Sequence, residues 1–91
     1  MMRTPIYSGQ FRRDLKIARK RGKDMEKIKK LMRLLIEDQS LPPEYKDHSL
    51  KGKWRSFRDA HIEPDWLLIY KIDSESVRFE RTGRHVDLFD E

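Results

Sequence analysis

Apolar residues recur with two different periods along the chain, and the change of period divides it into two halves. In the first half, Phe11, Leu15 and Ala18 follow the i, i+4, i+7 spacing of one buried helix face. This spacing predicts a helix over residues 9–21, with Ser8 as its N-cap.

A second helix is predicted over residues 25–38. Gly22 is suited to end the first helix, and Asp24 is suited to cap the second. The apolar positions of the second helix form a broad stripe made of Met25, Ile28, Leu31, Met32, Leu35 and Ile36. A linker this short predicts an antiparallel helical hairpin.

In the second half the period becomes two, which is typical of strands. The predicted strands are residues 5–7, a short edge strand, and 54–60, 66–72 and 77–82. Residues 73–76 form the turn between the last two strands, and the segment 41–53 is irregular because two prolines open it. Residues 85–89 are expected to form a short final strand or tail.

These elements predict a single domain over residues 1–91 with an α+β fold. A helical hairpin would pack on a small antiparallel sheet of three to five strands. The strand 66–70 is apolar at every position, so we expect it to be covered on both faces.

Charge is distributed unevenly along the chain. Residues 12–33 hold eleven Lys or Arg against three acids, a balance of +8, whereas residues 54–91 hold six basic and nine acidic residues, a balance of −3. A basic half attracts polyanions such as RNA or an acidic protein segment, although solvated helix faces would give the same pattern.

The composition also narrows the class of protein. The chain has no cysteine, which excludes disulfides and thiolate catalysis. No apolar stretch approaches the roughly 18 residues of a membrane span, and the N-terminus lacks the apolar region of a signal peptide. We therefore expect a cytoplasmic protein with no membrane association.

The candidate chemistry centres on residues 58–66, where His61 lies among the carboxylates of Asp59, Glu63 and Asp65. Pro64 interrupts this stretch, so a tight connection between two strands is expected there. The other two histidines, His48 and His85, also fall at predicted element ends in the second half. All three can therefore meet at one edge of a small sheet.

Three kinds of chemistry are candidates for such a cluster of histidines and carboxylates. Zinc binding is possible in principle, but the close ligand spacings of zinc motifs are absent. A serine hydrolase would need a nucleophile elbow, and none exists. Cleavage of RNA by its own 2′-hydroxyl needs an acid, a base and cations, and histidine serves near neutral pH in both proton-transfer roles. Candidate cations for the phosphate are Arg58, Arg81, Arg84, Lys46 and Lys51.

Phe89 is suited either to stacking on a base or to anchoring the C-terminal segment.

Several segments closely resemble the YafQ toxins of the RelE superfamily, which belong to bacterial toxin–antitoxin systems. These segments are Tyr7–Gln10, Lys23–Met25, Tyr45–His48, Arg58–Trp66 and Arg78–Gly83. The resemblance runs from about Ile6 to Phe89 at matching spacing. It departs at Ser49, Arg84 and Asp87, and in the acidic tail Asp90–Glu91.

The resemblance implies a compact microbial-RNase-like fold and a ribosome-dependent mRNA endonuclease. Such an enzyme would cleave mRNA in the ribosomal A site without a metal or cofactor, and a DinJ-type antitoxin would neutralise it in a hetero-oligomer. The basic helices would contact ribosomal RNA or receive the antitoxin. A non-catalytic RNA- or ribosome-binding module is the alternative.

The resemblance also implies the site residues. The catalytic residues would be His48, His61, Asp65 and His85, and Asp59, Arg81 and Phe89 would contact the RNA or lie at the site. His85 would be the general acid, and Arg81 would stabilise phosphate charge. The general base stays open among His48, His61 and Asp65, because coupled groups need not have one owner.

Overall fold

Both predicted helices are present in the computed structural model, which describes residues 2–89. Helix α1 (Gly9–Lys20) begins at Ser8, whose hydroxyl oxygen accepts a hydrogen bond from the Phe11 N–H at 2.9 Å. Helix α2 (Met25–Ile36) ends two residues earlier than predicted. The acidic tail Asp90–Glu91 lies outside the described residues.

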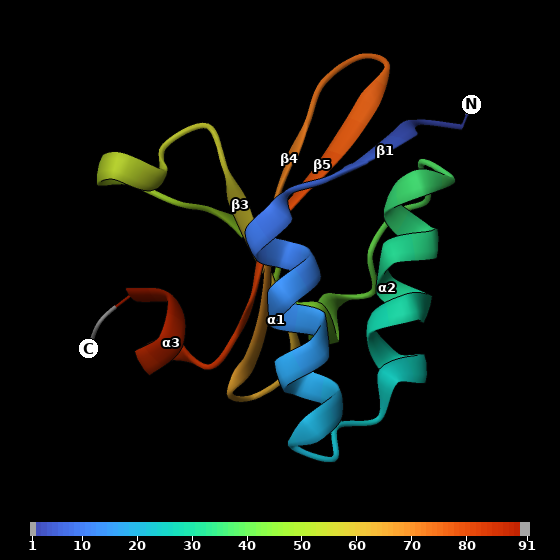
Figure 1. Ribbon diagram of the computed structural model, residues 1–91. Coiled ribbons are helices and arrows are strands. Elements are labelled where there is room, and N and C mark those ends of the chain that lie inside the picture. The colour runs from blue at the N-terminus through green and yellow to red at the C-terminus, as the bar shows by residue number, and fades with distance from the viewer. Residues whose placement is uncertain (1, 90–91) are drawn as a thin grey trace.

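The short connection between α1 and α2 has the predicted chemistry. Gly22 has a φ of +80°, a conformation that side chains with a Cβ rarely adopt. The Asp24 carboxylate accepts a hydrogen bond from the Glu26 N–H at 3.1 Å and so caps α2. Figure 1 shows the two helices running in opposite directions on one side of the sheet. The predicted helical hairpin is confirmed.

Five strands form one sheet in the order β1-β5-β4-β3-β2. Their bounds are β1 (Thr4–Tyr7), β2 (His48–Ser49), β3 (Arg58–Glu63), β4 (Trp66–Ile72) and β5 (Ser76–Gly83). The α+β fold is therefore confirmed, with one correction to the sheet. The strands β2 to β5 pair antiparallel, but the edge strand β1 pairs parallel with β5, so the sheet is mixed.

The central strand β4 is buried on both faces, as its sequence predicts. Its residues Trp66, Leu68 and Tyr70 pack in the main core, which includes apolar residues of both helices. Leu67 and Ile69 point to the opposite face and pack against a second, smaller core cluster. The partners there come from residues 50–57 and from the C-terminal helix.

One predicted strand begins later than its sequence pattern indicates. The segment predicted as a strand over 54–60 is strand only from Arg58, because Trp54 belongs to a 3-10 turn (Gly52–Trp54) and Ser56 has a φ of +88°. Trp54 and Phe57 instead pack beneath the second core cluster. A further 3-10 turn spans Pro43–Tyr45.

The segment 85–89 forms a helix, α3 (His85–Phe89), and not the predicted strand or tail. The backbone turns because the Asp87 carboxylate accepts the Arg84 N–H at 3.0 Å, and the Leu88 N–H bonds the Arg84 carbonyl at 3.1 Å. Leu88 of this helix is buried in the second core cluster. Within residues 2–89, no helix has the length and apolar character needed to cross a membrane.

Asp14 joins α1 to the free edge of β5 beyond the end of β1. Its buried carboxylate accepts hydrogen bonds from the Thr82 N–H at 3.1 Å and from Arg81 Nε at 2.8 Å. We expect Asp14→Ala to lower the free energy of unfolding by about 1–3 kcal/mol, because it leaves a buried N–H without a partner. Urea unfolding measures this, and Asp14→Asn is the matched control because its amide oxygen still accepts the Thr82 N–H. Equal losses for both variants would contradict this explanation.

Candidate active site

Three histidines from separate segments form one row. His48 begins β2, His61 lies in β3, and His85 is the first residue of α3. The ring centroids of His48 and His61 are 6.2 Å apart, and those of His61 and His85 are 6.0 Å apart. Ala60, which alternates with His61 on β3, points into the main core beneath the helices. The histidine row therefore lies on the sheet face turned away from α1 and α2.

Asp65 holds His85 from the connection between β3 and β4. Its Oδ1 accepts hydrogen bonds from the His85 backbone N–H at 2.9 Å and from His85 Nδ1 at 2.7 Å. These two hydrogen bonds hold the pKa of the Asp65 carboxyl below its usual value, and the one from the backbone N–H has the larger effect. Because a carboxylate only accepts, Nδ1 carries a proton, and Nε2 is the ring nitrogen left for chemistry.

His48 is oriented in a similar way by the backbone. Its Nδ1 lies 2.9 Å from the Lys46 carbonyl oxygen and 3.0 Å from Asp59 Oδ1. The carbonyl receives the ring N–H, and the carboxylate lies outside hydrogen-bond geometry, so the contact with Asp59 is electrostatic. His48 therefore also has its Nδ1 protonated and its Nε2 free.

Asp59 is buried behind the histidine row. Desolvation raises the pKa of its carboxyl above the usual value, while the nearby charges of His48, His61 and His85 act in the opposite direction. Each of the three rings, when protonated, would offset the negative charge of this buried carboxylate. His61 Nδ1 is itself buried without a hydrogen-bond partner among residues 2–89, a feature that is rare in structural cores.

The structure shows which residues Phe89 contacts. Phe89 packs against the second core cluster, with its ring centroid 6.2 Å from His85 and 6.4 Å from Trp54. Its contacts are those of an anchor for α3 that also borders the site.

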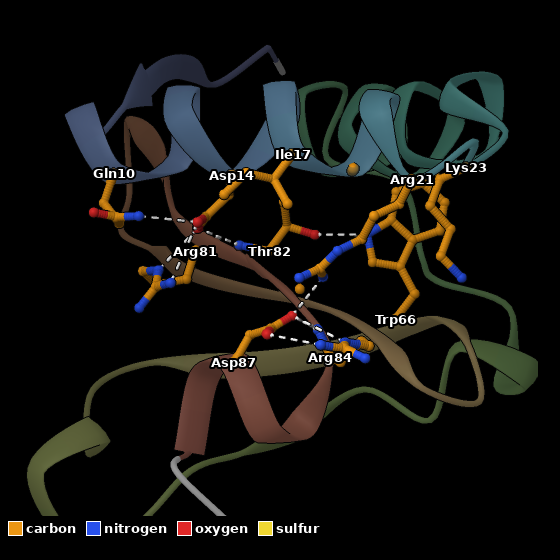
Figure 2. Close-up of a pocket in the computed structure, with 12 residues that line it drawn as sticks. Gln10, Asp14, Ile17, Arg21, Lys23, Trp66, Arg81, Thr82, Arg84 and Asp87 are labelled. Carbon is orange, nitrogen blue, oxygen red and sulfur yellow. Dashed lines mark hydrogen bonds and ion pairs between the residues drawn. The ribbon is translucent and has the colours of Figure 1, made fainter.

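The three candidate arginines are each paired with a carboxylate. Arg81 contacts Asp14 through Nε at 2.8 Å and Nη2 at 3.2 Å (Figure 2). Arg58 contacts Asp47 through Nε at 3.2 Å and Nη2 at 2.8 Å, and Arg84 contacts Asp87. Arg81 is thus directed toward α1, and two of its guanidinium nitrogens bind Asp14. Lys46 and Lys51 form no ion pair within the described part of the chain.

A groove beside His61 was not foreseen from the sequence. It is lined by Lys27, Lys30, Glu44, Tyr45, Lys46, His61, Ile62, Glu63 and Pro64. Glu63 binds Lys23 and Lys27 at 3.0 Å each, which draws the start of α2 toward β3. The clustered lysines of residues 27–30 were the available signal, but their nearness to a histidine depends on tertiary packing.

The described residues contain no group of three or more His, Asp or Glu side chains arranged to hold a metal ion. The site instead combines two histidines with a fixed tautomer, a central histidine and two carboxylates of different environment. Asp65 is exposed and accepts hydrogen bonds from His85, whereas Asp59 is buried. Such a set of groups can donate and accept protons near neutral pH.

A protein-family model matches residues 3–90 and defines the class of the molecule as a bacterial toxin of a type II toxin–antitoxin system. The family described by that model is YafQ. The chain belongs to the YafQ toxin family, as the resemblance of its motifs predicts.

Individual relatives agree with this assignment. The mRNA interferase toxin YafQ of Escherichia coli K12 is 58% identical over 84 residues, which are 91% of this chain and 91% of the relative. The crystal structure of the E. coli DinJ–YafQ toxin–antitoxin complex contains a chain with a TM-score of 0.92 and 56% identity, covering 98% of this chain and 99% of that one. A metal-bound toxin from Helicobacter pylori has a TM-score of 0.89 and 41% identity, covering 98% of this chain and 100% of that one.

Proposed function

We propose that this protein is an mRNA endoribonuclease that cleaves mRNA in the ribosomal A site and so inhibits translation. The observation that carries the proposal is the histidine row, whose end member His85 is held by Asp65 with its Nε2 free. The name of the E. coli relative, an mRNA interferase toxin, supports the same reaction class.

In the proposed reaction, the 2′-oxygen of the RNA attacks the adjacent phosphorus. A base takes the 2′-hydroxyl proton, the bond from phosphorus to the 5′-oxygen breaks, and His85 Nε2 gives its proton to the departing 5′-oxygen. The products are a 2′,3′-cyclic phosphate and a 5′-hydroxyl. Asp65 stabilises the imidazolium form of His85 before the transfer, because its ionised oxygen accepts from Nδ1.

The base is expected to be His48 or His61. Asp65, the third candidate, is a weaker base, because hydrogen bonds from the His85 backbone N–H and ring hold the pKa of its carboxyl below the usual value. His48 has the lone pair of Nε2 available when neutral, because its Nδ1 proton is directed at the Lys46 carbonyl. Asp59 would hold positive charge on the row, since its carboxylate lies 3.0 Å from His48.

RNA binding would use the cations around the row. Arg81 would stabilise phosphate charge with the guanidinium N–H groups that Asp14 does not occupy. The lysines of the groove beside His61 would contact the backbone of the bound strand, and the basic faces of α1 and α2 would contact ribosomal RNA. Phe89 would border the bound nucleotide next to His85.

The partner that neutralises this activity would be a DinJ-type antitoxin in a hetero-oligomer. The support is the fold shared with the toxin chain of the E. coli DinJ–YafQ complex. The exposed basic residues of α1 and α2 offer a surface for an acidic antitoxin segment.

The second candidate function is binding of RNA or the ribosome without cleavage, which the +8 balance of residues 12–33 alone would support. Mapping of RNA ends after brief expression distinguishes the two. We expect discrete new 5′-hydroxyl ends within coding sequences, at one position relative to the reading frame. Inhibition of translation with no new ends would favour the binding module.

Cleavage is expected to need no transition metal. Protein treated with a chelator, dialysed and assayed on mRNA-programmed ribosomes in magnesium buffer should retain its full cleavage rate. Addition of zinc, copper or nickel ions should not increase that rate. A rate that falls after stripping and returns with one of these ions would contradict a purely side-chain mechanism, and the metal-bound H. pylori toxin makes this comparison necessary.

A further inference from the structure

Helix α3 carries His85 but has only five residues. A single helical turn is not stable by itself, because nucleation costs more than one or two hydrogen bonds return. Its position must therefore come from contacts with the rest of the domain. Leu88 supplies one of them by its burial against Leu67 and Ile69.

Asp87 supplies a second contact, on another side of the helix. Its Oδ2 accepts hydrogen bonds from the Arg84 N–H at 3.0 Å and from Arg21 Nη1 at 2.7 Å, and Arg84 Nε lies 3.3 Å away. Figure 2 shows Arg21 reaching from the end of α1 to the carboxylate on α3. We call these three residues the Arg21–Asp87–Arg84 network.

The network is more than a surface ion pair between mobile side chains. Asp87 is partly buried, with 24% of its side chain exposed, and it caps the backbone of the helix that it belongs to. The hydrogen bond from Arg21 is the main reason that the pKa of the Asp87 carboxyl lies far below its usual range. Asp87 is consequently ionised at all pH values at which the protein would work.

The geometry also shows how close this anchor lies to the turn before His85. A Cβ added at Gly83 would meet Asp87 Cβ and Oδ2 at 3.2 Å each, so α3 folds back tightly on the end of β5. Asp65 then holds the ring and the backbone N–H of His85, while the Arg21–Asp87–Arg84 network holds the turn of α3 on both sides of it. The two anchors come from different elements and act on different atoms.

We propose that Arg21 and Asp87 are positioning residues for the cleavage reaction, which hold α3 so that His85 is set at the departing oxygen. This inference rests on the proposed function. Arg21 lies 64 residues before His85 in the sequence and acts only through Asp87, so it is not itself a catalytic residue.

The test compares single-turnover cleavage of ribosome-bound mRNA by Arg21→Gln and Arg19→Gln. Both remove one positive charge from the C-terminal end of α1, but Arg19 forms no ion pair within residues 2–89. We expect Arg21→Gln to lower the rate at saturating ribosomes by about three- to tenfold relative to Arg19→Gln, with similar half-saturating concentrations. Arg21→Lys should restore most of the rate, because an ammonium group can still reach Asp87.

Two results would overturn the proposal. The first is an equal saturated rate for Arg21→Gln and Arg19→Gln. The second concerns the double variant. If Asp87→Asn lowers the rate of the Arg21→Gln protein by the same factor as it lowers the rate of the wild type, the two residues act independently and not as a pair. Unchanged thermal unfolding of the variants would establish that the fold is retained.

Hydrogen exchange separates this proposal from the nuclease assignment. The Leu88 N–H, which bonds the Arg84 carbonyl, should exchange faster in Arg21→Gln than in Arg19→Gln. If the wild-type protein cleaves no RNA but this amide still responds, the proposed function fails and the anchoring of α3 stands. If cleavage occurs and neither rate nor exchange responds to Arg21, the anchoring role fails and the nuclease stands.

Discussion

Replacing His85 with alanine is expected to abolish growth inhibition and to lower the rate of mRNA cleavage by about 100- to 10,000-fold. General acid catalysis contributes this much when a proton must reach a poor leaving group, and no other described side chain shares the position of His85 beside Asp65. The fold should persist because the His85 side chain is exposed. Cleavage on programmed ribosomes, read by primer extension, measures the effect.

The controls for His85→Ala concern binding and folding. Binding of a DinJ-type antitoxin and the free energy of unfolding should match the wild type within error. His85→Gln should be as inactive as His85→Ala, since an amide has no proton to transfer at neutral pH. A well-expressed His85→Ala protein that still arrests growth with new 5′-hydroxyl ends would show that another group serves as the acid.

Asp59→Asn is expected to have two effects of opposite sign. Cleavage should fall roughly 10- to 100-fold, because the neutral amide no longer holds positive charge on His48 and its neighbours. The folded state should become more stable near neutral pH, because the variant no longer buries a carboxylate whose desolvation outweighs its attraction to the histidines.

The pH dependence of stability tests the second effect of Asp59→Asn. Burial raises the pKa of Asp59 above its ordinary value of 3.8, so the folded protein binds this proton more tightly than the unfolded chain does. The contribution of Asp59 to the free energy of unfolding of the wild type is therefore lost as the pH rises from 3.8 through the raised pKa. The advantage of Asp59→Asn should grow over that window and then level off in urea unfolding. A variant that is less stable than the wild type at neutral pH would contradict this account.

The helical half of the fold could be predicted from the sequence because each signal is local. The apolar spacing of α1 and the caps Ser8 and Asp24 lie within a few residues of the elements that they define. The same is true of the turn at Pro64, which sets His61 and Asp65 on the two sides of a hairpin end. These local signals were sufficient to predict that the three histidines, each at the end of an element, meet at one edge of the sheet.

The rest of the site depends on partners that are distant in the sequence. Arg58 pairs with Asp47 across 11 residues, and Arg81 pairs with Asp14 across 67. No periodicity relates such positions, so the sequence pattern could not predict that three of the candidate cations, Arg58, Arg81 and Arg84, are paired with carboxylates. Helix α3 was missed for another reason, since five residues are too few to distinguish a period of 3.6 from one of two.

The origin of the histidine row in three separate segments has a consequence for synthesis of the protein. His85 is added after every other member of the row and after all five strands. A polypeptide that stops at Gly83 or Arg84 would contain all five strand segments, the buried aspartate and two imidazoles, yet have no proton donor for the leaving oxygen, and one that stops earlier would lack more of the site. Prematurely terminated products should accordingly be harmless to the cell that makes them.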